Sequence, residues 1–113
     1  MGSTYQGPAE ISESLLQDGA TATGNGERFD TGGFAIAQFQ IEGITTATIT
    51  FEETNNGVDW HPTTAKNRNG GAEATTATAD GIYQVTCLGI QFMRARISAY
   101  TTGTIDVLAT AIV

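Results

Sequence analysis

The chain has 113 residues, which is the size of a single domain with one core. Acidic residues outnumber basic ones, with 12 Asp+Glu against 5 Lys+Arg and a formal net charge of −7. This charge repels phosphate backbones, and no basic stripe interleaved with aromatic residues is present, so nucleic acid is not an expected partner. No apolar stretch reaches the ~18 residues of a membrane span, and the N-terminus lacks the regions of a signal peptide. We therefore expect a chain that is made in the cytoplasm and has no membrane partner.

The first third of the chain is the least regular part. Glycine-containing pairs interrupt any long element between residues 4 and 33. Residues 9–16 fit either a short helix or an edge strand, and the pattern does not distinguish them. The apolar side chains of this segment need burial, either on the same domain or on a neighbouring subunit; they are Tyr5, Ile11, Leu15 and Leu16.

A predicted hairpin, residues 45–62, organises the next part. Apolar Ala47, Ile49 and Phe51 alternate with polar residues, which predicts a half-buried strand. An Asn-Gly pair at 56–57 then predicts a two-residue turn. In that register Glu53 faces Trp60, and we expect the indole to point inward as a core anchor. A loop longer or shorter by one residue would send Trp60 to the other face, where its ring is a ligand platform.

The remaining strands are short and separated by turn signals. Residues 34–41 form a strand that turns at 42–44, residues 63–78 read as an exposed loop, and residues 82–87 form a strand. Residues 91–100 are expected to close a hairpin at 101–104 onto a final strand, 105–113. This final strand is apolar on both faces, so it is either central or covered by a partner.

Short strands at regular spacing predict an all-β fold, an antiparallel β-sandwich of about seven or eight strands. The topology is either jelly-roll or immunoglobulin-like. We expect an irregular N-terminal arm, residues 1–28, followed by the sandwich domain, residues 29–113.

Residues that perform chemistry are sparse. The single cysteine, Cys87, excludes an intrachain disulfide and reads as a small buried hydrophobe. His61 is the sole histidine, and with one distant cysteine it does not make a usual zinc set. We therefore expect no catalytic residue, no metal and no cofactor. The acidic and amide residues of the first loops, which are the least implausible calcium ligands, are better explained by turn formation.

Short motifs in a particular order resemble small β-sandwich virion proteins of tailed bacteriophages. The sequences that carry the resemblance are Thr-Ala-Thr-Gly-Asn-Gly at 21–26, Asp-Thr-Gly-Gly-Phe at 30–34, Thr-Ile-Thr-Phe-Glu at 48–52, Asn-Gly-Val-Asp-Trp at 56–60, Asp-Gly-Ile-Tyr-Gln-Val at 80–85, and the segment 92–105. The hairpin at 54–60 also looks like the strand-turn-strand of discoidin-type carbohydrate- and lipid-binding sandwiches.

The resemblance implies a structural protein of the virion and no enzyme. The leading expectation is a capsid decoration or cement protein that binds the major capsid protein or other virion proteins, with a homo-oligomer in the particle. The expected interface residues are Tyr5, Ile11, Leu15, Leu16, Arg94 and Arg96. The alternative is a neck, tail or fibre component that acts as a carbohydrate-binding module, with Trp60, Tyr83 or Tyr100 as a stacking platform.

Overall fold

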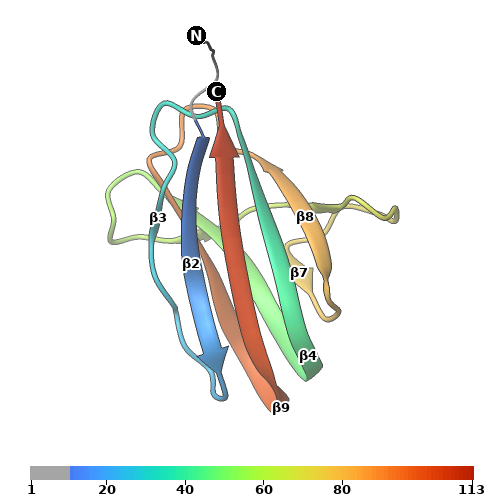
Figure 1. Cartoon of the computed structure of the whole chain (residues 1–113). Helices are drawn as coiled ribbons and strands as arrows, with labels where there is room; N and C mark the ends of the chain where they lie inside the picture. The colour runs from blue at the N-terminus through green and yellow to red at the C-terminus, as the bar shows by residue number, and fades with distance from the viewer. Residues whose placement is uncertain (1–10) are drawn as a thin grey trace, which may run out of the picture.

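A computed structural model describes residues 11–113 of the chain (Figure 1). These residues form strands and no helix, and every strand pairing is antiparallel. The predicted all-β antiparallel fold is therefore confirmed. The strands are β2 (Ile11–Ala20), β3 (Phe29–Asp30), β4 (Ile36–Thr54), β5 (His61–Pro62), β6 (Lys66–Asn67), β7 (Thr76–Ala77), β8 (Gly81–Thr86) and β9 (Phe92–Ile112).

Two long strands, β4 and β9, form the centre of the fold. They have 19 and 21 residues and pair with one another from Ile36↔Ile112 to Thr54↔Phe92. The turns predicted at 42–44 and 101–104 are wrong, because neither segment reverses the chain. At both places the strand continues with a shift of register, and the two strands bend together.

Two glycines at this bend explain why the sequence has the pattern of a turn there. We call this bend, at Gly43 and Gly103, the corner of the sheet. Gly43 has a φ of +89°, and a Cβ built on it would overlap the carbonyl oxygen of Thr104. Gly103 has a φ of +133°, and its Cβ would lie 2.6 Å from the carbonyl oxygen of Gly43. Both positions require glycine because the backbones touch where the sheet folds over.

The corner divides the sheet into two stacked layers (Figure 1). The front layer consists of β2, β6 and β8 together with residues 36–42 of β4 and residues 105–112 of β9. The back layer consists of β3, β5, β7 and the other halves of β4 and β9, at 45–54 and 92–102. Phe39 of the front layer meets Phe51 of the back layer with 5.5 Å between ring centroids. The core lies between the layers, as expected for a β-sandwich.

Part of the predicted N-terminal arm is a strand, β2, at one end of the order of described strands. Of the two alternatives for residues 9–16, the described part is a strand, because β2 pairs with β9 along Ile11–Ala20. A register shift after Leu15 turns both Leu16 and Gln17 inward, and Gln17 Nε2 donates to the carbonyl oxygen of Ala95 at 2.9 Å in the back layer. Residues 11–20, which the sequence assigns to the arm, thus form a strand of the sheet.

The central position of the last strand agrees with its composition. β9 lies between β2 and β4, so its apolar alternation is covered on both edges. Cys87 is buried, and burial raises the pKa of its thiol. Both observations match the roles that the sequence predicts for these segments.

Candidate functional site

The tryptophan does not lie in the core. The structure pairs Glu53 with His61 and Glu52 with Pro62, so the register differs by one residue from that of a two-residue turn at Asn56-Gly57. Trp60 consequently lies half-buried on the outer face of the back layer. The prediction of an inward-pointing indole is wrong.

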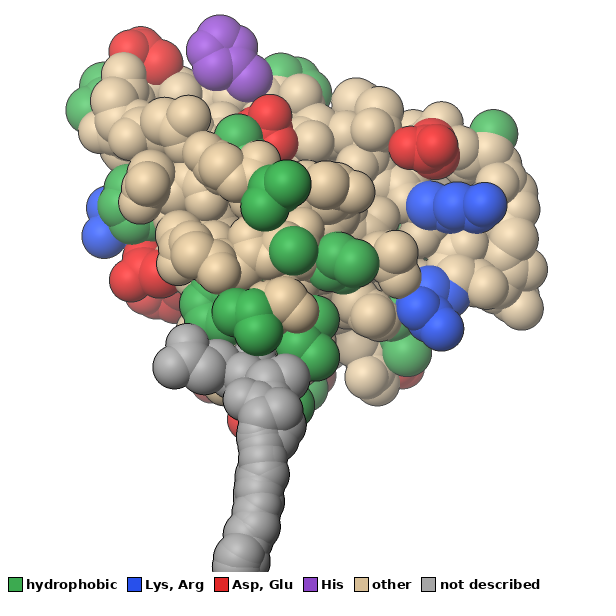
Figure 2. All heavy atoms as spheres, turned by 90° about the horizontal axis from the view of Figure 1, so that it is seen from above, with side chains coloured by type: hydrophobic (Ala, Val, Ile, Leu, Met, Phe, Trp, Pro, Cys, Tyr) green, Lys and Arg blue, Asp and Glu red, His purple; other side chains and the backbone are tan. Residues whose placement is uncertain are grey.

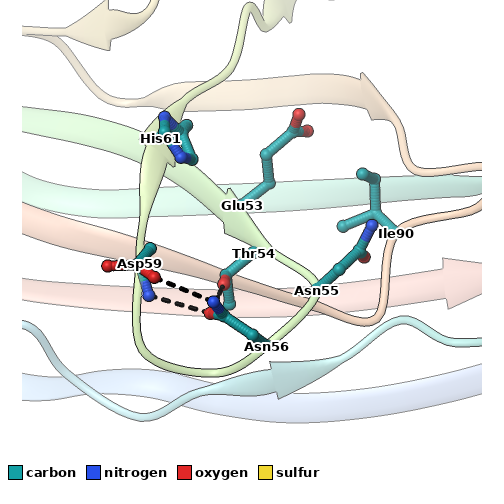
Figure 3. A pocket seen from close by; sticks show the side chains of 7 residues that line it. All are labelled: Glu53, Thr54, Asn55, Asn56, Asp59, His61 and Ile90. Atoms are coloured by element: carbon teal, nitrogen blue, oxygen red, sulfur yellow. Dashed lines mark hydrogen bonds between the residues drawn. The ribbon is translucent and has the colours of Figure 1, made fainter.

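Side-chain hydrogen bonds enlarge the loop and cause this change of register. Asn56 Oδ1 accepts hydrogen bonds from the backbone N–H groups of Val58 and Asp59 at 2.8 and 2.9 Å. Thr54 Oγ1 accepts another from the N–H of Gly57 at 3.2 Å. These bonds satisfy the loop backbone without a tight hairpin turn, as Asn side chains commonly do. Figure 3 shows Asn56 bonded to Asp59 across the loop.

On the outer face, Trp60 joins a group of charged residues that we call the Trp60 cluster: Glu52, Trp60, Arg94 and Arg96. Arg94 Nε donates to Glu52 Oε1 at 2.8 Å. Arg96 binds the same carboxylate twice, from Nε to Oε1 at 3.1 Å and from Nη2 to Oε2 at 3.2 Å. The guanidinium carbon of Arg94 lies 4.2 Å from the centroid of the Trp60 ring, a cation–π contact.

The electrostatics of the Trp60 cluster favour the ionised form of its carboxylate. Burial acts to raise the pKa of Glu52, but the hydrogen bonds and charges of Arg96 and Arg94 outweigh it and lower the pKa below the usual 4.5. The Glu52 side chain is only 7% exposed, so its two arginines are held in a defined geometry.

A second cation–π pair lies beside this cluster. The Arg28 guanidinium carbon is 3.9 Å from the ring centroid of Phe92, and Arg28 also pairs with Asp30 at 3.7 Å. Three of the five basic residues of the chain therefore lie on or beside this face.

A polar pocket of about 500 Å³ opens next to the loop (Figure 3). Asp59 in its wall accepts a hydrogen bond from Asn56 Nδ2 at 2.9 Å, so it supports the loop. His61 and Glu53 face each other across the paired strands β4 and β5. Among residues 11–113, no group of three or more His, Cys, Asp or Glu side chains is arranged to hold a metal ion. The pocket is lined by Glu53, Thr54, Asn55, Asn56, Asp59, His61 and Ile90.

The outer surface of the front layer, which we call the front face, has a different character. Its strand register aligns Ile11, Ile112 and Ile36 in one row, and Leu15 and Leu108 in another. Ile11 is 70% exposed and Leu15 is 43% exposed. A shallow cavity of about 300 Å³ lies over the first row. Figure 2 shows hydrophobic side chains gathered at the edge of the molecule where the front layer ends.

The predicted interface residues divide between these two surfaces. Ile11 and Leu15 lie on the front face, whereas Leu16 is buried in the core. Arg94 and Arg96 lie in the Trp60 cluster on the opposite layer. Tyr5 is outside the described residues. The structure therefore does not bring the predicted set together in one patch.

The three rings predicted as alternative stacking platforms lie in different environments. Tyr83 is buried against Phe51 with 5.5 Å between centroids, and its hydroxyl donates to the carbonyl oxygen of Ala79 at 2.7 Å. Burial and the charge of Asp80 raise the pKa of Tyr83. Tyr100 lies near the corner and donates its hydroxyl hydrogen to the carbonyl oxygen of Gly103. Only Trp60 of the three belongs to an outer-face cluster.

Other residues of both surfaces were missed. Glu52 is absent from the predicted site residues, although its alternation with Phe51 places it on the face opposite the core. Ile36, Leu108 and Ile112 were assigned to strands without a surface role. Their alternation with the buried residues Ala37, Ala109 and Ala111 is the signal that would have placed them on the front face.

Three comparisons with known proteins relate the fold to a family. No curated protein matches the sequence. The crystal structure of the SPBc2 prophage-derived protein YomS superposes with a TM-score of 0.84 at 16% identity, covering 96% of this chain and 97% of YomS. The crystal structure of the PBSX exported protein XepA gives a TM-score of 0.89 at 14% identity, covering 96% of this chain and 39% of XepA.

This chain thus spans well under half the length of the XepA protein, and these structural matches show the same fold. Within residues 11–113, no helix is long and apolar enough to cross a membrane. The family assignment comes from the sequence, because residues 10–111 match the model of one family over most of the chain. The chain belongs to the XepA family.

Proposed function

We propose that this chain is a phage structural protein of the virion, which acts by binding other proteins, and that its specific role is capsid decoration. Two comparisons support the phage context: YomS is derived from the SPBc2 prophage, and XepA is a protein of PBSX. XepA is also an exported protein, which fits a site of action outside the cytoplasm. The proposal includes no catalysis.

The front face is the observation that carries a binding role. Its two apolar rows are separated by a polar row that runs from Glu13 through Thr110, Gln38 and Gln84 to Lys66, so charged side chains stand only at the two ends of this strip. An apolar surface of this kind is unusual on a chain with a net charge of −7 and marks a contact with another protein. Among the described strands β2 pairs only with β9, so its outer edge along Ile11–Leu15 offers backbone groups to the same partner.

The major capsid protein is the proposed partner, with copies of this chain repeated over the shell as a homo-oligomer or as separate decorations. The proposal is tested by counting the copies of the protein in purified virions with quantitative mass spectrometry, relative to the major capsid protein. Decoration requires on the order of hundreds of copies, because the shell repeats its symmetric contacts. From about six to a few dozen copies would place the protein in the neck, tail or fibre instead. Absence from the particle would overturn the proposal.

The second candidate function is a carbohydrate-binding module of a neck, tail or fibre. One observation favours it: the Trp60 cluster combines an aromatic ring with two arginines and a carboxylate on an outer face. Rings that stack on sugars and side chains that bind hydroxyl groups are the usual elements of such a site. Loss of glycan binding in Trp60→Ala, with an unchanged far-UV spectrum, would support this function, and a negative result on a broad glycan panel would exclude it.

A further inference from the structure

The Trp60 cluster has hydrogen-bonding capacity that the protein does not use. The two guanidinium groups carry more N–H donors than the three hydrogen bonds that Glu52 accepts from them. Within the described residues, Glu52 is the only acceptor for either arginine. The Arg96 side chain is 35% exposed, so its remaining donors are accessible from solvent. The cluster therefore offers ordered donors to an external acceptor.

The indole ring adds an apolar surface beside these donors. Trp60 is half-buried, and the guanidinium of Arg94 at 4.2 Å holds the orientation of the ring. The C–H groups on one face of a sugar ring are apolar and pack on aromatic rings, while the hydroxyl groups at its edge bind polar side chains. An aromatic ring with fixed donors next to it matches that pattern.

The local charge selects among saccharides. Three arginines pair with only two carboxylates on this face, which leaves one positive charge. The arginines are Arg28, Arg94 and Arg96, and the carboxylates are those of Glu52 and Asp30. The chain as a whole carries −7, so the rest of its surface repels anions. An anionic ligand is therefore directed to this face, where a guanidinium binds a carboxylate or a phosphate in a charge-assisted geometry.

We propose that the Trp60 cluster binds a saccharide that carries a carboxylate or a phosphate. The sugar ring packs on Trp60, and the anionic group accepts hydrogen bonds from Arg96 and from the free donors of Arg94. This inference rests on the second candidate function, the carbohydrate-binding module, and specifies its ligand class.

Intrinsic fluorescence tests the proposal directly, because Trp60 is the only tryptophan of the chain. The full chain is titrated with an oligogalacturonate, with the neutral methyl ester of the same oligosaccharide, and with mannose 6-phosphate. We expect a saturable change of fluorescence with the oligogalacturonate or with mannose 6-phosphate, and binding at least about tenfold weaker with the ester. The first and third ligands distinguish a carboxylate from a phosphate preference.

Charge variants locate the binding. Arg96→Gln is expected to weaken binding of the anionic saccharide about tenfold or more, with no comparable effect on the ester. Arg68→Gln is the matched control, because it removes one positive charge just after β6, where Arg68 donates a hydrogen bond to Gln84. Thermal unfolding of both variants, followed by circular dichroism, checks that each is folded.

The outcomes separate the inference from the function on which it rests. Equal binding of the ester and the charged oligosaccharide would overturn the anionic preference and leave a carbohydrate-binding module. Equal weakening by Arg96→Gln and Arg68→Gln would overturn the assignment to the Trp60 cluster. No binding of any of the three saccharides would overturn this inference, and a negative broad glycan panel would also exclude the second function.

Discussion

The two outer faces of this sandwich are built from the same two strands and have opposite chemistry. On the front face, β4 and β9 present rows of isoleucine and leucine with little charge between them. On the back layer the other halves of the same strands present Glu52, Arg94 and Arg96, joined by Trp60 from the loop. A single bend at Gly43 and Gly103 separates the two surfaces.

The difference shows how one continuous strand pair supplies two kinds of surface. The inward residues are apolar in both halves, because both layers share the core between them. The outward residues have no such common constraint, so each half can carry its own surface chemistry. We propose that the front face binds a protein partner and that the back face binds an anionic saccharide.

The largest expected effect comes from breaking the corner that separates the faces. Gly43→Ala places a Cβ against the carbonyl of Thr104 at a φ of +89°, and we expect a loss of about 3 kcal/mol or more in the free energy of unfolding. Gly89→Ala is the matched control, because its φ is +84° but no atom lies within 4 Å of the new Cβ. Urea unfolding should show about 1 kcal/mol for the control. Equal losses in both variants would contradict the role of the corner.

Disrupting the back face alone should lower the free energy of unfolding by a smaller amount. Glu52→Ala removes the carboxylate shared by Arg94 and Arg96, and we expect about 2 kcal/mol of destabilisation, since both arginines retain some contact with water. Glu42→Ala, at an exposed carboxylate bonded to Gln40, should change stability by no more than about 0.5 kcal/mol. Chemical unfolding of both variants measures the contrast, and a silent Glu52→Ala would show that the Trp60 cluster adds no stability.

Acid should weaken the same cluster reversibly. The pKa of Glu52 is lowered in the folded protein below its usual 4.5, so its contribution is present above about pH 4.5 and is lost as the pH falls through the folded value. Stability of the wild type should therefore fall more steeply below pH 4.5 than that of Glu52→Gln. Thermal midpoints measured between pH 3 and pH 7 test this, and parallel curves for the two proteins would refute it.

The smallest effect on stability is expected on the front face. Leu15→Ser replaces a side chain that is 43% exposed, so the free energy of unfolding should change by about 0.5 kcal/mol or less, while binding to phage particles that lack this protein should be strongly reduced. Leu88→Ser is the matched control at a leucine that is 75% exposed outside the front face. Co-sedimentation with the particles measures binding. Equal binding by both variants would exclude the front face as the docking surface.

Local alternation was enough to predict much of this fold. Ala47, Ile49 and Phe51 face the core as their period of two requires, and Cys87 is buried as its apolar neighbours indicate. The composition of the last strand limited it to a central place or to one covered by a partner, because an apolar edge would be exposed to other chains, and the structure has it in a central place. These features depend on which residues avoid water, and that preference can be read from neighbouring positions.

The path of the chain at its glycines and the position of Trp60 could not be predicted in this way. A glycine with positive φ serves equally in a turn and in a bent strand, so Gly43 and Gly103 look like turns until their backbones are seen to meet across the sheet. The position of Trp60 depends on the length of one loop, which Asn56 sets by accepting hydrogen bonds from the backbone N–H groups of Val58 and Asp59. Local sequence thus determines which residues are apolar and where the chain is free to bend. Contacts between distant segments determine whether a bend reverses the chain and which face a shifted residue occupies, because those choices depend on partners that are remote in the sequence.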